Sequence, residues 1–207
     1  MPTSDKSIST YSALWRATAP ISLNAFALPA PELAQFLLGT VIFHAETAGM
    51  IVETEAYLGA DDLAAHSSRG HTDRTKVIFG PAGHAYVYLI YGMYECLNVV
   101  ADVAGTPGCV LIRALEPIAG LPMMYQRRRW LGPPKGLANG PGKLTRALAI
   151  TRGHYGCRLD KGPLSIRHWR NKPDFKIAIT PRIGISQCTD WPLRFIFDGH
   201  PCLSRPL

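Results

Sequence analysis

Apolar residues recur at helical spacing near the start of the chain. The segment Pro31–Gly39 begins with proline, which is tolerated in the first turn of a helix, and stops at glycine. Between these ends, Leu33, Phe36 and Leu37 fall on one helical face. The pattern predicts a short helix that leads into a strand.

Two apolar and partly β-branched runs follow, at residues 40–44 and 49–56. Only a few residues separate them, which predicts an antiparallel hairpin. Side chains alternate along a strand, so Glu53 and Glu55 share one face of the second strand while Thr54 points to the other. The predicted hairpin therefore carries two carboxylates near the end of an apolar strand.

Further strands and helices complete the predicted fold. Strands are expected at residues 85–91, 97–101, 109–115, 164–166, 177–180 and 193–197, and helices at 121–130 and 143–150. Gly92, Met93 and Tyr94 lie near the tip between the first two of these strands. The many strands lack a strand–helix–strand rhythm. They predict an α+β fold with a curved, largely antiparallel sheet, flanking helices and a protruding β-hairpin.

The length of 207 residues and the hydrophobic content of 47% are sufficient for one domain with a full core. Residues 1–28 lack the uninterrupted apolar stretch of a secretory signal. We predict a flexible N-terminal extension over 1–28 and one domain over 29–207. The five cysteines contain no Cys-x-x-Cys pair, which indicates thiols in a reducing compartment. A cytoplasmic monomer is the expectation.

Positive charge is concentrated in one part of the chain. Residues 121–172 hold twelve Lys or Arg against one Asp, a net charge of +11, whereas residues 1–120 hold six basic and eleven acidic residues, a net of −5. The basic segment could be an ordinary solvated surface. Nucleic acid is the partner that most naturally uses it, because each neutralised phosphate releases counterions. A membrane is not expected, since no stretch approaches the roughly 20 apolar residues of a spanning helix.

An aromatic-rich run, Tyr86–Tyr94, follows the carboxylate strand. Tyr86, Tyr88 and Ile90 fall on one face of the expected strand. Alternating tyrosines usually pack a sheet, and strand-end carboxylates are usually solvated or salt-bridged. Flat rings and carboxylates together in a basic protein instead suggest chemistry on a nucleobase taken out of its stack.

Paired carboxylates invite comparison with glycoside hydrolysis. Glu53 and Glu55, roughly 7 Å apart on one strand face, would approach a substrate from the same side rather than flank its bond. One carboxylate is enough for the N-glycosidic bond of an alkylated purine, because alkylation makes the base a good leaving group. Such an enzyme needs a general base for water and a pocket for the purine.

Two other functions stay open at this point. A metal-dependent hydrolase could use Glu53, His66 and His71, although their spacing matches no established zinc or iron signature. A nucleic-acid-binding module without catalysis would need none of these groups. The run from Gly140 to Leu144 lacks the Gly-Lys-Ser/Thr ending of a phosphate loop, but Lys143 could still hold one backbone phosphate.

Several long motifs occur in order along the chain. They are Ile51-Val-Glu-Thr-Glu-Ala-Tyr-Leu-Gly59, Ala65-His-Ser67, Tyr86-Val-Tyr-Leu-Ile-Tyr-Gly-Met93, Leu97-Asn98, Val110-Leu-Ile-Arg-Ala-Leu-Glu-Pro117 and Asn139-Gly-Pro-Gly-Lys-Leu144. In this order they resemble the alkyladenine (3-methyladenine) DNA glycosylase family. The resemblance implies a DNA-repair enzyme that flips alkylated purines out of duplex DNA and hydrolyses the N-glycosidic bond without a metal or cofactor.

The resemblance also implies catalytic roles. Glu55 would be the general base that deprotonates the attacking water, and Arg113 and the main-chain carbonyl of Ile183 would help to hold that water. No Lys occupies a matched nucleophile position, so a Schiff base and strand cleavage are not expected. Lys143 and Arg146 are the candidate phosphate contacts.

The remaining implied roles concern the base and the duplex. Tyr57 and His66 would stack on opposite faces of the flipped base, and Tyr88 would close the pocket edge. Asn98 would obstruct the exocyclic amino group of normal guanine. Tyr91, with Met93 beside it at the hairpin tip, would enter the minor groove and fill the vacated stack. A protein with these roles would be associated with the nucleoid through DNA binding.

Overall fold

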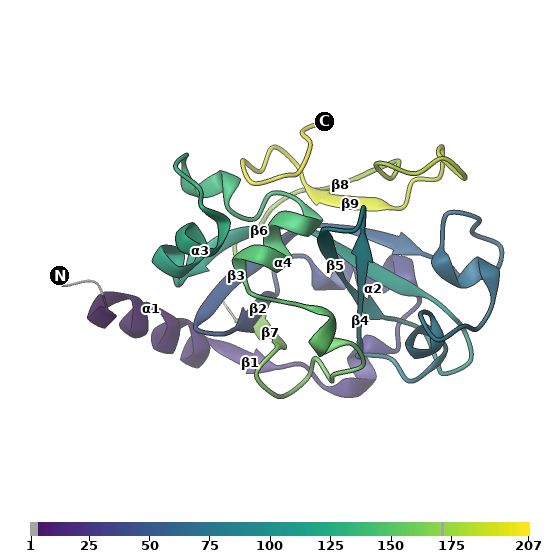
Figure 1. The fold of residues 1–207 in the computed structure, drawn as a ribbon, viewed down its shortest axis with the longest axis horizontal. Helices are drawn as coiled ribbons and strands as arrows, with labels where there is room; N and C mark the ends of the chain where they lie inside the picture. The colour runs from purple at the N-terminus through teal and green to yellow at the C-terminus, as the bar shows by residue number, and fades with distance from the viewer. Residues whose placement is uncertain (1–3, 171) are drawn as a thin grey trace.

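A nine-stranded, open sheet forms the centre of the computed structural model, which describes residues 4–170 and 172–207 (Figure 1). The main path through the sheet runs β1-β7-β2-β3-β6-β5-β4, with β9 paired to β3 and β8 paired to β9. Every strand pairing described is antiparallel. Within the described residues four α-helices accompany this sheet, so the predicted α+β class is confirmed.

The predicted carboxylate hairpin is present as β2 (Val41–His44) and β3 (Thr47–Tyr57). Because β2 is short, it pairs with only the first part of β3, and β9 (Arg194–Phe197) pairs with the part from Glu53 to Glu55. On its other side β3 pairs with β6 (Cys109–Ala119). The two carboxylates therefore lie in the middle of the sheet.

The register between β3 and β6 shifts at three places: between Ala48 and Gly49, and on either side of Glu53, between Ile51 and Glu53 and between Glu53 and Thr54. Such irregularities locally bend a strand and re-aim its side chains. Both neighbouring strands cover this part of β3, and each β3 residue up to Ala56 is buried. The bend consequently directs charged side chains into the interior.

Three helices match the predictions closely. The observed bounds are α2 (Ala30–Leu37), α3 (Leu121–Arg128) and α4 (Pro141–Ala147). Helix α4 begins at Pro141, two residues before the predicted start, because proline fits the first helical turn. The helices contribute Leu33, Leu37, Met124 and Leu144 to the main core, all with no exposed surface.

The N-terminal segment differs from the prediction of a flexible extension. Residues 4–17 form the helix α1 (Ser4–Ala17), which lies at one end of the molecule (Figure 1). The strand β1 (Thr18–Pro20) then pairs with β7 (Ser165–Trp169). Side chains of α1 also contact the sheet, since Trp15 packs edge-on against Phe43 at 5.0 Å. The described part of this segment is therefore structured and joins the sheet.

The predicted protruding hairpin consists of β4 (Ala85–Ile90) and β5 (Tyr94–Val100). Tyr91 and Gly92 form its tip with φ of 52° and 68°, and the Met93 N–H donates to the Ile90 carbonyl. Two positive φ values define the turn that matches the twist of a tight hairpin. The strand β8 (Ile177–Thr180) completes the sheet. Among the described residues, no helix is long and apolar enough to cross a membrane.

Candidate active site

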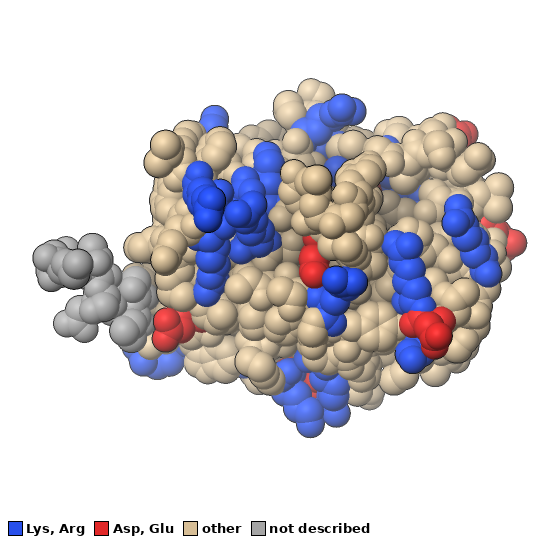
Figure 2. Space-filling model, in the orientation of Figure 1, with Lys and Arg blue, Asp and Glu red and all other residues tan. Residues whose placement is uncertain are grey.

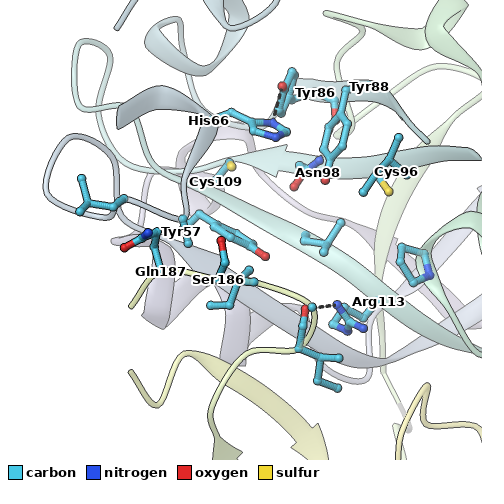
Figure 3. A pocket seen from close by; sticks show the side chains of 18 of the residues that line it. Tyr57, His66, Tyr86, Tyr88, Cys96, Asn98, Cys109, Arg113, Ser186 and Gln187 are labelled. Atoms are coloured by element: carbon cyan, nitrogen blue, oxygen red, sulfur yellow. Dashed lines mark hydrogen bonds between the residues drawn. The ribbon is translucent and has the colours of Figure 1, made fainter. Parts of the chain in front are cut away.

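A cavity of about 410 Å³ opens beside the end of β3 (Figure 3). Strands β3, β4, β5 and β6 form part of its wall, and the segments 63–69 and 183–187 together with Pro141 of α4 form the rest. Its lining includes the sequence-predicted residues Tyr57, His66, Tyr88, Asn98, Arg113 and Ile183. Side chains from distant parts of the chain therefore converge on one cavity of the size of a small-molecule site.

Glu55 is held by three donors. The Ile183 N–H donates to its Oε1 at 2.7 Å, while the Tyr57 hydroxyl and Arg113 Nη1 donate to its Oε2 at 3.0 and 3.2 Å. Burial raises the pKa of the Glu55 carboxyl, although Arg113, the Ile183 N–H and the Tyr57 hydroxyl each oppose that rise. The three donors fix the carboxylate in place, and its pKa stays above the ordinary value for a glutamate.

The side chain of Glu55 is fully buried and does not itself form part of the cavity wall. Its three donors do line that wall, so the carboxylate lies directly behind Tyr57, Arg113 and Ile183. A water molecule in the cavity can reach Glu55 only where these groups separate. The cavity and the carboxylate are thus adjacent but closed from each other.

Ile183 uses both of its main-chain groups here, whereas the sequence analysis considered only its carbonyl. The N–H binds Glu55, and the carbonyl accepts a hydrogen bond from Arg113 Nη1 at 3.4 Å. A carbonyl oxygen has two lone pairs, so it can accept a further hydrogen bond from a water. Ile183 therefore connects the two charged side chains as well as facing the cavity.

Glu53 has a different environment from Glu55. It accepts hydrogen bonds from Arg113 Nε at 3.2 Å, from Arg194 Nε at 2.8 Å, and from both the N–H and the hydroxyl of Ser204 at 2.6 and 2.8 Å. Its side chain is fully buried and does not line the cavity. These contacts hold Arg113 and the C-terminal segment in position and leave Glu53 no open side for a substrate.

Aromatic rings form the upper part of the cavity wall (Figure 3). His66 meets Tyr88 edge-on at 4.6 Å, and its Nδ1 lies 2.9 Å from the hydroxyl of Tyr86. Burial, followed by the charges of Arg74 and Arg69, lowers the pKa of His66 to about 4. His66 is therefore a neutral ring at physiological pH, suited to stacking on a base.

Tyr57 lies across the cavity from these rings (Figure 3). Its outer face is covered by Arg182, whose guanidinium carbon is 4.6 Å from the ring centroid. Arg182 is fully buried and binds both carboxylate oxygens of Asp62, at 2.5 and 2.8 Å. This ion pair fixes Tyr57 from behind and leaves its other side toward the cavity.

Arg182, Asp62 and Tyr86 are the site residues that the sequence analysis did not assign. Asp62 accepts hydrogen bonds from Arg182 and from the main-chain N–H groups of Leu58 and Ala64. Two features of the sequence could have indicated these residues: Arg182 lies next to Ile183 in the chain, and Tyr86 shares a strand face with Tyr88.

Polar groups of the cavity wall near Tyr88 are also buried (Figure 3). Asn98 is 3% exposed, lines the cavity and donates from Nδ2 to the Tyr86 carbonyl at 3.1 Å. Burial raises the pKa of the Cys96 and Cys109 thiols to about 11 and about 12. Both thiols therefore stay protonated, so they offer no thiolate nucleophile to the cavity.

The hairpin tip does not contribute to the cavity, apart from the strand residue Ile90 below it. Tyr91 and Met93 are 79% and 68% exposed, and Tyr94 beside them is 44% exposed. Large apolar side chains gathered on one protrusion indicate a surface that contacts a partner. The predicted wedge residues are thus outside the pocket and free to enter another structure.

Lys143 and Arg146 are exposed on α4, near that tip. Lys143 Nζ donates to Asn139 at 2.9 Å, and Arg146 Nε donates to the Arg127 carbonyl at 2.8 Å. A hollow lined by Tyr91, Tyr94, Arg128 and Lys143 shares Arg113 and Ile183 with the cavity. Lys and Arg side chains gather on the face shown in Figure 2.

The metal-ligand set considered from the sequence does not assemble. Among the described residues, no three His, Cys, Asp or Glu side chains form a group that could hold a metal ion. Glu53 is occupied by two arginines and Ser204, as described above, while exposed His71 packs against Phe79 at 5.3 Å. The structure therefore separates Glu53, His66 and His71 into different environments.

A buried, hydrogen-bonded carboxylate lies behind an aromatic cavity, and an exposed aromatic tip and basic side chains lie beside that cavity. Such an arrangement suits an enzyme that acts on flat bases within a polyanion. Residues 24–201 match the family described as Methylpurine-DNA glycosylase. The chain belongs to this family.

Similar proteins carry the name "Putative 3-methyladenine DNA glycosylase". One from Methanoculleus marisnigri is 51% identical over 179 residues, covering 84% of this chain and 92% of the relative. One from Bacillus cereus is 46% identical over 191 residues, and one from Bacillus anthracis is 45% identical over 193 residues. Both of these matches cover 84% of this chain and 93% of the relative.

Proposed function

We propose that this protein is a monofunctional DNA glycosylase of base-excision repair. It takes an alkylated purine of the 3-methyladenine type out of duplex DNA and hydrolyses its N-glycosidic bond with a water activated by Glu55. The observation that carries this proposal is the position of Glu55, held by three donors that all line one aromatic cavity. Family membership supports DNA as the substrate.

In the proposed reaction the water oxygen attacks the anomeric carbon of the flipped nucleotide. The bond from that carbon to the base nitrogen breaks, and its electron pair leaves with the base. The water proton goes to Glu55, and the products are an abasic site and a free purine. Alkylation places positive charge on the purine, so the base departs without strong acid catalysis.

Access to Glu55 requires a small rearrangement in this proposal. The base enters between Tyr57 and His66, with Tyr88 at the pocket edge, and Asn98 excludes the amino group of normal guanine. Stacking on Tyr57 shifts the ring whose hydroxyl now donates to Glu55. Arg113 and the carbonyl of Ile183 then hold the water that takes the place of this hydroxyl.

Burial favours the neutral form of Glu55, and the neighbouring cation and N–H favour the ionised form. A general base is most effective when its pKa lies close to the operating pH, so a raised pKa suits this role. The cavity wall contains no lysine among the residues described, which supports water rather than an amine as the nucleophile.

The direct test is incubation of the protein with alkylated duplex DNA, followed by chromatography of the released bases. We expect free alkylated purines and intact strands that contain abasic sites. Release that stops in chelator would favour the metal-dependent hydrolase instead. DNA binding with no released base would favour the non-catalytic binding module.

A further inference from the structure

A second hollow, of about 500 Å³, lies at the outer edge of β4. Its lining residues come from β4, from the loop around residue 74 and from the segment around residue 152; they are Asp73, Arg74, Lys76, Val87, Tyr88, Leu89, Arg152 and Tyr155. Only Tyr88 also lines the base cavity. The β4-edge hollow is thus separate from the proposed active site but shares one ring with it.

Backbone groups of β4 face this hollow. Strand β4 is the last strand of the sheet path, and Ala85 directs its N–H and carbonyl away from β5, to Cys157 and Gly156. In an antiparallel strand the outward groups recur at every second residue. Val87 and Leu89 therefore present their N–H groups to the same edge, where they can donate to an anionic oxygen.

Three cations, Arg74, Lys76 and Arg152, line the same hollow as Val87 and Leu89. The guanidinium carbon of Arg74 lies 5.1 Å from the centroid of the Tyr88 ring. Lys76 Nζ lies 3.6 Å from Asp73 Oδ1, and Arg152 Nε lies 3.6 Å from Glu95 Oε1. All three cations are exposed. The Lys76–Asp73 pair is exposed and therefore weak, and Arg152 is 64% exposed although its partner Glu95 is only 19% exposed, so both cations remain accessible to a stronger anion. Phosphate is such an anion, because it offers several charged oxygens.

The position of the hollow relative to the hairpin suggests its ligand. From the β4-edge hollow, strand β4 leads directly to Tyr91 at the hairpin tip. Arg128 and Lys143 line a different hollow, the one described above that also contains Tyr91. Figure 2 shows Lys and Arg in separate groups on this face, with tan surface and a small acidic group between them. A wedge in a minor groove has one sugar–phosphate backbone on each side, which matches this arrangement.

We propose that the β4-edge hollow binds backbone phosphates of the DNA strand on its side of the hairpin. The group that contains Arg128 and Lys143 faces the opposite strand. This inference rests on the proposed function, because it takes duplex DNA as the substrate and the hairpin tip as the wedge. It adds a contact from Lys76, which lies outside the basic segment 121–172, and it singles out Arg152 within that segment.

The test is a salt titration of binding to a duplex that carries a stable abasic-site analogue. The double variant Lys76→Gln, Arg152→Gln is compared with a matched control, Lys161→Gln, Arg170→Gln, in which two exposed cations outside the hollow are lost. We expect the hollow variant to reduce the slope of log affinity against log salt by about 1.8, which corresponds to about 0.9 for each of two phosphates. An equal change in the control, or no change in the hollow variant, would overturn the proposal.

Neutral methylphosphonate linkages identify the strand. Placed beside the abasic analogue on one strand at a time, they should weaken wild-type binding from either strand. The hollow variant should become insensitive to the linkages on one strand only, and equal loss of sensitivity on both strands would contradict the assignment. Base release by the wild-type protein is measured alongside, since its failure would contradict the glycosylase proposal, whereas an unchanged salt slope contradicts only the hollow.

Discussion

The floor below the cavity and the tip of the β4–β5 hairpin are built on opposite principles. Below the cavity, Glu53, Glu55 and Arg113 are 0%, 0% and 9% exposed and tie each other in place. At the tip, Tyr91 is 79% exposed and sits on a two-residue turn. A buried charge network is costly unless every member is paired, whereas an exposed ring costs little until it meets a partner.

This difference separates the two tasks of the proposed reaction. Bond cleavage needs a base held at one position, and the network around Glu55 provides it. Opening a duplex needs an apolar side chain that can leave water and enter a stack, and exposed Tyr91 is the side chain that we propose for this task. Substitutions in the two regions should therefore affect different measurements.

The largest effect is expected for Glu55→Gln. The amide keeps the shape of the side chain but cannot take a proton from water, so base release should fall by about 10²- to 10⁴-fold. Binding to alkylated duplex should persist in a gel-shift assay. Glu32→Gln, an exposed change on α2, is the control and should leave both measurements as they are. A Glu55→Gln protein with undiminished release would remove Glu55 from the mechanism.

Glu53→Gln should mainly affect stability. It leaves Arg113 and Arg194 buried with a weaker partner, and breaking such a network costs about 3–5 kcal/mol in the free energy of unfolding. Urea unfolding measures this, with exposed Asp174→Asn as the control, for which we expect a change within about 0.5 kcal/mol. Equal stability of Glu53→Gln and the wild type would show that the network is not required for folding.

Tyr91→Ala should have a smaller effect, confined to duplex opening. Stacking of a base on an aromatic side chain contributes about 1–3 kcal/mol, so release of a well-paired lesion should slow by roughly 5- to 150-fold. A mispaired lesion costs less to extract and should be released almost as fast as by the wild type. The matched control is Ile179→Ala, an exposed apolar residue on β8. Equal slowing for both lesions would count against the wedge.

Much of the fold follows from local sequence pattern. Alternating apolar runs predicted β3, β4, β5 and β6, and Pro141 with its glycine neighbours marked α4 only two residues from its true start. Such elements depend on nearby residues, so a pattern of ten residues identifies them. The pattern of hydrophobic residues along the chain therefore predicts most strands of the sheet.

The N-terminal strand could not be predicted in this way. β1 is three residues long, and its place in the sheet depends on pairing with β7, about 150 positions further along the chain. Arg167 also donates to Thr18, at 2.8 Å from its Nε. The sequence of residues 1–28 alone does not indicate that this segment pairs with so distant a strand. The segment was therefore predicted to be a flexible extension.

The candidate site also has a part that local sequence motifs predict and a part that depends on contacts between distant positions. The cavity does gather Tyr57, His66, Tyr88 and Asn98, whose motifs carry the family resemblance, but their individual roles stay predictions. The Arg182–Asp62 pair joins positions 120 residues apart, and Ser204 reaches Glu53 from 151 residues away. These supporting contacts exist only in the folded chain.

Charge counting also gave an incomplete answer. Arg127 belongs to the basic segment, yet its guanidinium donates to the carbonyls of Ala147 and Ala45 at 3.0 and 3.1 Å. Arg128 likewise donates to the Leu137 carbonyl at 3.0 Å. Part of the positive charge therefore also holds loops together. Whether a given arginine meets phosphate depends on the free donors that remain.

The pH dependence of single-turnover base release tests the role of Glu55 most directly. Burial raises the pKa of this carboxyl above its ordinary value of 4.5, and a base acts only when deprotonated, so release should fall as the pH drops through that raised pKa. His66, with a pKa of about 4, stays neutral over this range and should add no step near 6.5. The account predicts an acid limb that His66→Gln retains and that the residual activity of Glu55→Gln lacks. An acid limb that persists unchanged in Glu55→Gln would contradict it.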